Sequence, residues 1–189
     1  MHPRLAHILL PVLLFQGCHY YIGHPDNLPN LYDRRVGQVA LMDENIEINA
    51  REDLNNDPVI PNQSHVNVNA YNGTLLVTGE VKGERVHKQI LEKMRILQGV
   101  KRVQDELVEA PGADLASQSN DSFITTRIKT ELDKIHDPAD FNGANIKVVT
   151  ENGCVYLMGL VYKEEADLVT TVVQKLPGVT AVVKLFEYL

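Results

Sequence analysis

Two stretches of this chain carry the same pattern and decide its fold. Residues 66–81 read VNVNAYNGTLLVTGEV, and residues 146–161 read IKVVTENGCVYLMGLV. In each stretch apolar residues alternate on both sides of an Asn-Gly pair, Asn72-Gly73 and Asn152-Gly153. Asn-Gly suits a two-residue β-hairpin turn because both central residues need positive φ. The spacing of 80 residues between the two pairs predicts two small consecutive domains rather than a solenoid.

Helical periodicity flanks each predicted hairpin. Apolar residues recur every third or fourth position before the hairpin and again after it, which indicates one buried stripe per helix. In the second copy the stripe is Ile124, Ile128, Leu132 and Ile135, and Asp121 precedes it as the expected N-cap. We therefore expect helices at residues 44–54, 84–97, 121–135 and 164–176, with closing strands at 100–108 and 179–188.

The order of these elements predicts the fold class. It is an α+β fold of two tandem domains, each α-β-β-α-β, with two helices on one face of a three-stranded sheet. The hairpin strands are antiparallel, and the helix-linked strand crosses over right-handed to run parallel, so each sheet is mixed. Domains of about 65 residues are marginal alone, so we expect the two to pack together.

The first residues are typical of a lipoprotein signal peptide. A short apolar run ends in Leu14-Phe15-Gln16-Gly17-Cys18, which resembles a bacterial lipobox. Cleavage before Cys18 would leave that cysteine with an S-diacylglycerol and an N-acyl chain, the only non-protein groups expected. The alternatives are an ordinary signal peptide and a buried N-terminal helix with an incidental cysteine. Cys154 is then left as a structural thiol on a predicted strand.

These observations divide the chain into five parts. We expect a signal peptide at 1–17, a lipid-anchored tether at 18–43, a first domain at 44–109, a linker at 110–120 and a second domain at 121–189. His19, rather than Asp, follows the acylated position, which by analogy with bacterial sorting rules favours the outer membrane.

Composition argues against several classes of function. The formal charge of −7 opposes non-specific nucleic-acid binding, and no stretch approaches the roughly 20 apolar residues of a transmembrane helix. The seven histidines show no metal-ligand spacing, and the chain has neither a nucleophile elbow nor a glycine-rich phosphate loop. We therefore expect no catalytic residues, no metal and no small-molecule substrate.

The duplicated pattern resembles the BON domain (bacterial OsmY and nodulation). The lipobox, residues 67–73, the run from Ser119 to Thr126 and residues 149–161 carry the resemblance to the dual-BON outer-membrane lipoproteins of Gram-negative bacteria. The resemblance implies a non-enzymatic protein, anchored in the outer membrane and facing the periplasm, that supports membrane integrity. It also implies links to anionic phospholipid, the cell-division site and the barrel-assembly machinery.

A phospholipid site is predicted on the first helix of the second domain. Phe123 lies one residue off the core stripe, about 100° around the helix, and Arg127 follows on the same flank. An aromatic ring beside cations suits an anionic lipid surface. The predicted binding residues are Phe123, Ile124, Arg127, Ile128 and Lys134. The alternative is that Phe123 packs against the linker or the first domain.

The first domain lacks this feature, because Asn45 replaces the aromatic residue on an acidic helix. We expect that domain to pack against the second or to meet a protein partner. The leading hypothesis is a lipid-anchored protein that binds anionic phospholipid through its second domain. The rival is a periplasmic protein–protein adaptor or chaperone-like factor acting on envelope proteins.

Overall fold

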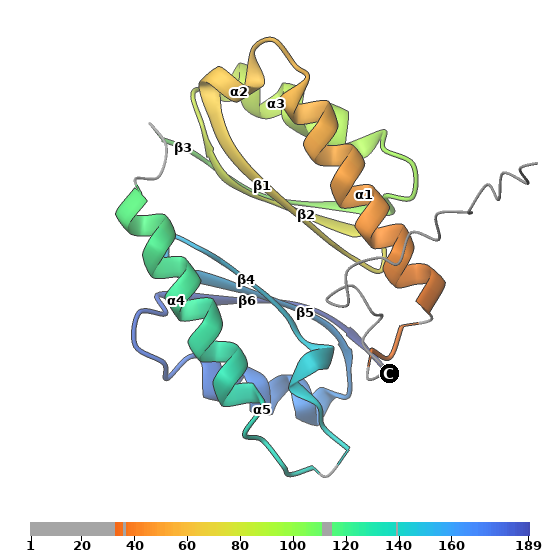
Figure 1. Ribbon diagram of the computed structural model, residues 1–189, viewed down its shortest axis with the longest axis vertical. Coiled ribbons are helices and arrows are strands. Elements are labelled where there is room, and N and C mark those ends of the chain that lie inside the picture. The colour runs from red at the N-terminus through yellow and green to blue at the C-terminus, as the bar shows by residue number, and fades with distance from the viewer. Residues whose placement is uncertain (1–32, 36, 111–114, 139) are drawn as a thin grey trace, which may run out of the picture.

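The computed structural model describes residues 33–35, 37–110, 115–138 and 140–189, which form two similar α+β domains (Figure 1). The predicted signal peptide, Cys18 and the tether up to Tyr32 lie outside the described residues.

The first domain contains three helices and three strands among its described residues. They are α1 (Gly37–Asn55), α2 (Ile60–Gln63), β1 (Ser64–Tyr71), β2 (Thr74–Val81), α3 (Glu84–Arg95) and β3 (Arg102–Glu109).

The second domain repeats this order. Its elements are α4 (Leu115–Leu132), a 3-10 turn (Gly143–Asn145), β4 (Lys147–Glu151), β5 (Cys154–Val161), α5 (Lys163–Val173) and β6 (Ala181–Tyr188).

Both sheets have the predicted mixed topology. Their strand orders are β1-β2-β3 and β4-β5-β6, with the hairpin pairs antiparallel and the helix-linked pairs parallel. The hairpin strands pair directly across each turn, Tyr71 with Thr74 and Glu151 with Cys154. The α+β class and the tandem repeat are therefore confirmed.

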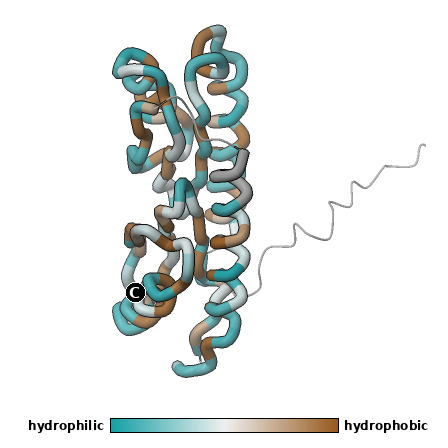
Figure 2. The backbone as a smooth tube through the Cα atoms, turned by 90° about the vertical axis from the view of Figure 1, so that its left-hand side faces the viewer, coloured by the Kyte–Doolittle hydropathy of each residue, from teal (hydrophilic) through white to brown (hydrophobic). Residues whose placement is uncertain are grey.

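Each domain buries its own aliphatic core between the helices and the outer face of its sheet. In the first domain the stripe Ile46, Ala50 and Leu54 of α1 packs with residues of α3 and of the strands. In the second, the stripe Ile124, Ile128 and Leu132 of α4 does the same. Figure 2 shows the corresponding alternation of hydrophobic and hydrophilic segments along the backbone. Burying each isoleucine or leucine of these stripes stabilises the fold by about 1.5–3 kcal/mol.

Each Asn-Gly turn is held by an aspartate carboxylate from the first helix of its domain. Asn72 and Asn152 have φ of 49° and 50°, as the predicted turn type requires. Asp43 accepts hydrogen bonds from the amides of Asn72 (2.6 Å) and Gly73 (2.8 Å). Asp121 does the same for Asn152 (2.7 Å) and Gly153 (2.8 Å).

Asp121 is therefore not the helix N-cap that the sequence predicted. It is buried inside α4, which begins upstream at Leu115, within the segment expected to be a linker. α1 likewise begins at Gly37, in the predicted tether. An Asp before an apolar stripe is typical of an N-cap. Local sequence does not show that Asp121 instead accepts hydrogen bonds from the amides of a distant turn.

The helices cover the outer faces of the two sheets, so that the inner faces meet (Figure 1). Tyr71 and Leu76 of the first sheet and Tyr156 and Met158 of the second form a third buried cluster between them. Val149, Cys154, Leu160, Val183 and Leu185 pack against it from the second sheet. The expected packing of the two domains is present and contains a hydrophobic core of its own.

Carboxylates accept several of the side-chain hydrogen bonds that cross this interface. Asn72 donates to Glu187 (2.5 Å), and Asn152 donates to Glu80 (2.5 Å). Glu151 accepts from Asn67 (2.8 Å) and Thr78 (3.1 Å). Lys147 of the second domain bonds to Glu47 of the first. These bonds fix the register of the two sheets, because each requires one pair of residues to face one another.

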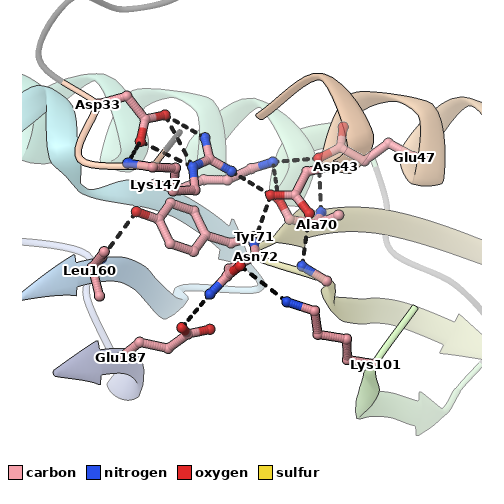
Figure 3. A network of polar contacts seen from close by, with 12 residues as sticks. Asp33, Asp43, Glu47, Ala70, Tyr71, Asn72, Lys101, Lys147, Leu160 and Glu187 are labelled. Carbon is pink, nitrogen blue, oxygen red and sulfur yellow. Dashed lines mark hydrogen bonds and ion pairs between the residues drawn. The ribbon is translucent and has the colours of Figure 1, made fainter. Parts of the chain in front are cut away.

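A short segment before α1 fastens to both domains. Arg34 forms two hydrogen bonds with Glu165 of α5 (2.5 and 2.7 Å). Arg35 pairs with Asp43 of α1 (2.5 Å) and lies over the Tyr71 ring, 4.0 Å from its centroid. The Tyr71 hydroxyl in turn accepts from the Leu160 amide of the second domain (3.0 Å; Figure 3). Residues 33–35, predicted as tether, are therefore part of the folded body.

Replacing Asp121 with Ala should destabilise the second domain. Two turn amides would lose a charged acceptor, at a cost of about 1–3 kcal/mol in the free energy of unfolding. Chemical denaturation measures this change. Asp53→Ala is the control, because Asp53 is also helical but exposed. Equal small effects of both substitutions would contradict the role assigned to Asp121.

The Arg34–Glu165 pair predicts a dependence of stability on pH. Hydrogen bonds from Arg34 lower the pKa of Glu165 below its ordinary value of 4.5. The pair therefore stabilises the fold fully above that value, and the gain is lost as the pH falls through the lower folded-state pKa. We expect Glu165→Gln to lower the unfolding free energy at pH 7 by about 1–2 kcal/mol.

The difference between Glu165→Gln and the unsubstituted chain should shrink as the pH falls below about 4. Glu164→Gln, an exposed neighbour in the same helical turn, should change little at any pH. A difference that does not vary with pH would contradict the assignment.

Candidate functional site

The candidate site lies on the outer surface of α4, and the buried side of that helix positions it. Ile124, Ile128 and Leu132 are 4%, 0% and 1% exposed, and Ile135 is partly buried against the same core. Gly178, in the connection between α5 and β6, lies directly beside Ile124. The helix can neither roll nor slide without opening this core, so its outer residues have fixed directions.

Phe123 stands on the exposed side of this helix. Its side chain is 75% exposed, although the adjacent Ile124 is buried. A phenylalanine this exposed does not staple α4 to the first domain, so the structure disfavours the alternative in which Phe123 packs there. A large ring held in water by a rigid helix has much to gain from an apolar environment.

Arg127 lies one helical turn beyond Phe123 and is also exposed. Its guanidinium donates to the carbonyl of Pro177 at 3.4 Å, which holds the side chain beside the α5–β6 connection. Among the described residues, Arg127 forms no ion pair, so no carboxylate in that part of the chain neutralises its charge.

The other predicted residues have different surroundings. Lys134 is exposed but pairs with Glu131 at 2.7 Å. Lys129, a further cation of α4 outside the predicted set, is also exposed, yet the helical period places it about 120° around the helix from Phe123. Of the five residues predicted to bind lipid, Phe123 and Arg127 are therefore brought together at the surface, and Lys134 is exposed further on. Ile124 and Ile128 lie in the core and act by positioning the helix.

The structure adds one exposed cation near the site, Lys175, which the sequence pattern did not indicate. Because Pro177 contacts Arg127, the connection between α5 and β6 lies beside the candidate site, and it carries the exposed Lys175. The contact joins positions 50 residues apart, and no local periodicity signals such a contact.

The equivalent surface of the first domain differs in chemistry. Asn45 is exposed at the position corresponding to Phe123, and Glu44, Glu52 and Asp53 are exposed around it. Leu41 and Met42 near the start of α1 are also exposed, at 58% and 49%. These two residues fall in the predicted tether, because the sequence pattern predicted that the helix begins at Glu44.

The described residues give little support for a metal site or a membrane-spanning helix. No group of three or more His, Cys, Asp or Glu side chains in the described ranges could hold a metal ion. None of the helices that the structure describes is long and apolar enough to cross a membrane. Cys154 is a half-buried thiol on β5, where it packs at the edge of the cluster between the sheets.

Comparison with known proteins gives a consistent assignment. The sequence profile of the BON domain matches residues 42–111 and 120–189. The chain is 29% identical over 188 residues to "Outer membrane lipoprotein DolP" of Haemophilus influenzae, covering 98% of this chain and 96% of that protein. It is 27% identical over 170 residues to "21 kDa hemolysin" of Actinobacillus pleuropneumoniae, covering 90% and 86%.

Among solved structures, CdsD, a structural protein of the type III secretion system of Chlamydia trachomatis, aligns with 77% of this chain and 92% of its own. The TM-score of that alignment is 0.27 at 17% identity. The profile matches, which coincide with the two α-β-β-α-β units, show that this chain belongs to the BON-domain family.

Proposed function

We propose that this protein is an outer-membrane lipoprotein that binds anionic phospholipid through its second BON domain. The observation that carries the proposal is Phe123, 75% exposed on a helix fixed by its buried face, beside Arg127, which has no ion-pair partner in the part of the chain that the structure describes. The similarity to an outer membrane lipoprotein along nearly the whole chain supports the location.

The energetics favour a weak surface contact assisted by an anchor. Transfer of the Phe123 ring out of water contributes about 1.5–3 kcal/mol, and each cation near an anionic surface adds about 1 kcal/mol. Glu131 and Asp133 oppose such a surface. A lipid chain on Cys18 would hold the domain near the bilayer and raise its effective concentration there. The lipid anchor would then provide affinity for the membrane, and the contact through α4 would set the orientation of the protein on the bilayer.

In this proposal the protein faces the periplasm and supports outer-membrane integrity. The proposed contacts include the division site and the barrel-assembly machinery. The first domain fits a supporting role, because its exposed acidic helix surface would be repelled by anionic lipid and its inner face packs on the second domain.

A periplasmic adaptor or chaperone-like factor remains the rival function. It differs in what the second domain should recognise, because an adaptor has no need of anionic headgroups. Lipid recognition instead requires binding that depends on headgroup charge and falls as salt rises, since salt screens the cations.

Vesicle co-sedimentation of residues 19–189 tests the proposal. The fragment contains every described residue and lacks Cys18. We expect it to bind vesicles containing phosphatidylglycerol and not vesicles of phosphatidylcholine alone. Phe123→Glu should weaken binding about ten-fold or more, because it removes the ring and adds a repelled charge. Arg127→Glu should weaken it similarly and flatten the salt dependence.

Ile96→Glu is the matched control. Ile96 is 82% exposed, like Phe123, but lies in the first domain. This variant should bind vesicles normally, and thermal unfolding should show all three variants folded. Unchanged binding by Phe123→Glu, or equal binding to both lipid compositions, would favour the adaptor.

A further inference from the structure

A groove between the two domains lies on a different side of α4. Its volume is about 720 Å³, within the range of ligand-binding pockets. The first domain contributes the end of α1 and residues 65–69 of β1, and the second contributes part of α4 and residues 149–151 of β4. Thr125 and Thr126 form part of its wall, whereas Phe123 does not line it.

Both strands that line this groove are sheet edges. β1 and β4 each have a neighbour on one side only. Along an antiparallel edge strand, backbone groups point alternately toward the partner strand and away from it. The Lys82 amide donates to the Gln63 carbonyl, so Gln63 and Lys82 form a hydrogen-bonded pair at the start of the β1–β2 ladder. Because such pairs alternate along the ladder, the backbone N–H and C=O groups of the odd-numbered residues of β1 point toward β2. The backbone groups of Val66, Val68 and Ala70 therefore point outward.

The protein covers one of these outward positions itself. The Ala70 amide donates to Glu47 (2.8 Å), and the Ala70 carbonyl accepts from Lys147 (3.1 Å; Figure 3). Val66 and Val68 have no such partner among the described residues, and both line the groove. They present two N–H and two C=O groups at a two-residue spacing, which is the spacing of bonds along a β-ladder.

The side chains around these groups are mainly neutral. Asn55, Asn67, Asn69, Thr125, Thr126 and Thr150 line the groove. The two carboxylates there are already occupied, Asp121 by the turn amides and Glu151 by Asn67 and Thr78. Arg51 is paired with Glu47, and the His65 ring lies 3.3 Å from the Asn67 side-chain amide. This chemistry suits uncharged backbone amides better than an anion, a cation or a lipid headgroup.

We propose that the groove binds an extended peptide segment of a partner protein, which adds to the outer edge of β1. The peptide backbone pairs with Val66 and Val68, and the amide and hydroxyl side chains receive its neutral or small side chains. Residues of α1 and α4 line the groove beside the two strand edges, so the occupant in this proposal is a single extended chain and not the sheet edge of a second copy. This site is separate from the proposed lipid surface.

Selection of a phage-displayed random dodecapeptide library on residues 19–189, followed by titration of an enriched synthetic peptide, tests the proposal. In the free protein the Val66 and Val68 amide hydrogens should exchange faster than those of Asn67 and Asn69. Bound peptide should slow exchange at Val66 and Val68 selectively. No enriched peptide, or protection confined to other residues, would overturn the proposal.

Thr126→Trp should block the groove and weaken peptide binding by about ten-fold or more. Thr130→Trp is the matched control. Both threonines are exposed on α4 and bond to the carbonyl four residues earlier at 2.9 Å, but Thr130 does not line the groove. Phe123→Glu should leave peptide binding unchanged, which separates this test from the lipid proposal. Equal effects of the two tryptophan substitutions would contradict the site, as would peptide-induced dimerisation in light scattering.

Discussion

The rest of the structure depends on the hydrogen bonds that hold the two Asn-Gly turns. In each domain the turn residues need positive φ, and a helical aspartate accepts both of their amides. The asparagine side chain then donates to a glutamate of the other domain, Asn72 to Glu187 and Asn152 to Glu80. One dipeptide thus connects the hairpin, the first helix and the domain interface. Gene duplication explains why the device occurs twice and acts reciprocally.

Duplication did not preserve chemical symmetry between the inner faces. The second sheet contributes most of the apolar residues of the cluster between the sheets, whereas the first contributes Tyr71 and Leu76 among many polar groups. A polar face that meets an apolar one must satisfy its hydrogen bonds across the interface, because unpaired buried groups cost about 1–3 kcal/mol each. The carboxylate–amide pairs meet that requirement, although Glu80 Oε2 still has no partner among the described residues. The interface is therefore specific for one arrangement of the domains.

The features that the sequence could predict depend on interactions between residues close together in the chain. The alternation around Asn-Gly and the helical stripes through Ile46 and Ile124 set the element order, because periodicity and turn chemistry act over a few residues. The early part of α1 and the docking of Arg34 on Glu165 were missed, since the latter contact spans 131 residues. At the candidate site, helical geometry separated Phe123 from the core. The contact of Arg127 with Pro177 required the tertiary fold.

The arrangement gives α4 three distinct sides. One is buried with Ile124 and Ile128, one presents Phe123 and Arg127, and one forms the groove wall through Thr125 and Thr126. Because Asp121 ties the same helix to the Asn152-Gly153 turn, and that turn is tied to the first domain, these sides keep fixed directions relative to both sheets. A bilayer contact through Phe123 would therefore also orient the groove. The proposed lipid and peptide surfaces do not overlap, so occupation of one leaves the other accessible in a defined direction from the membrane.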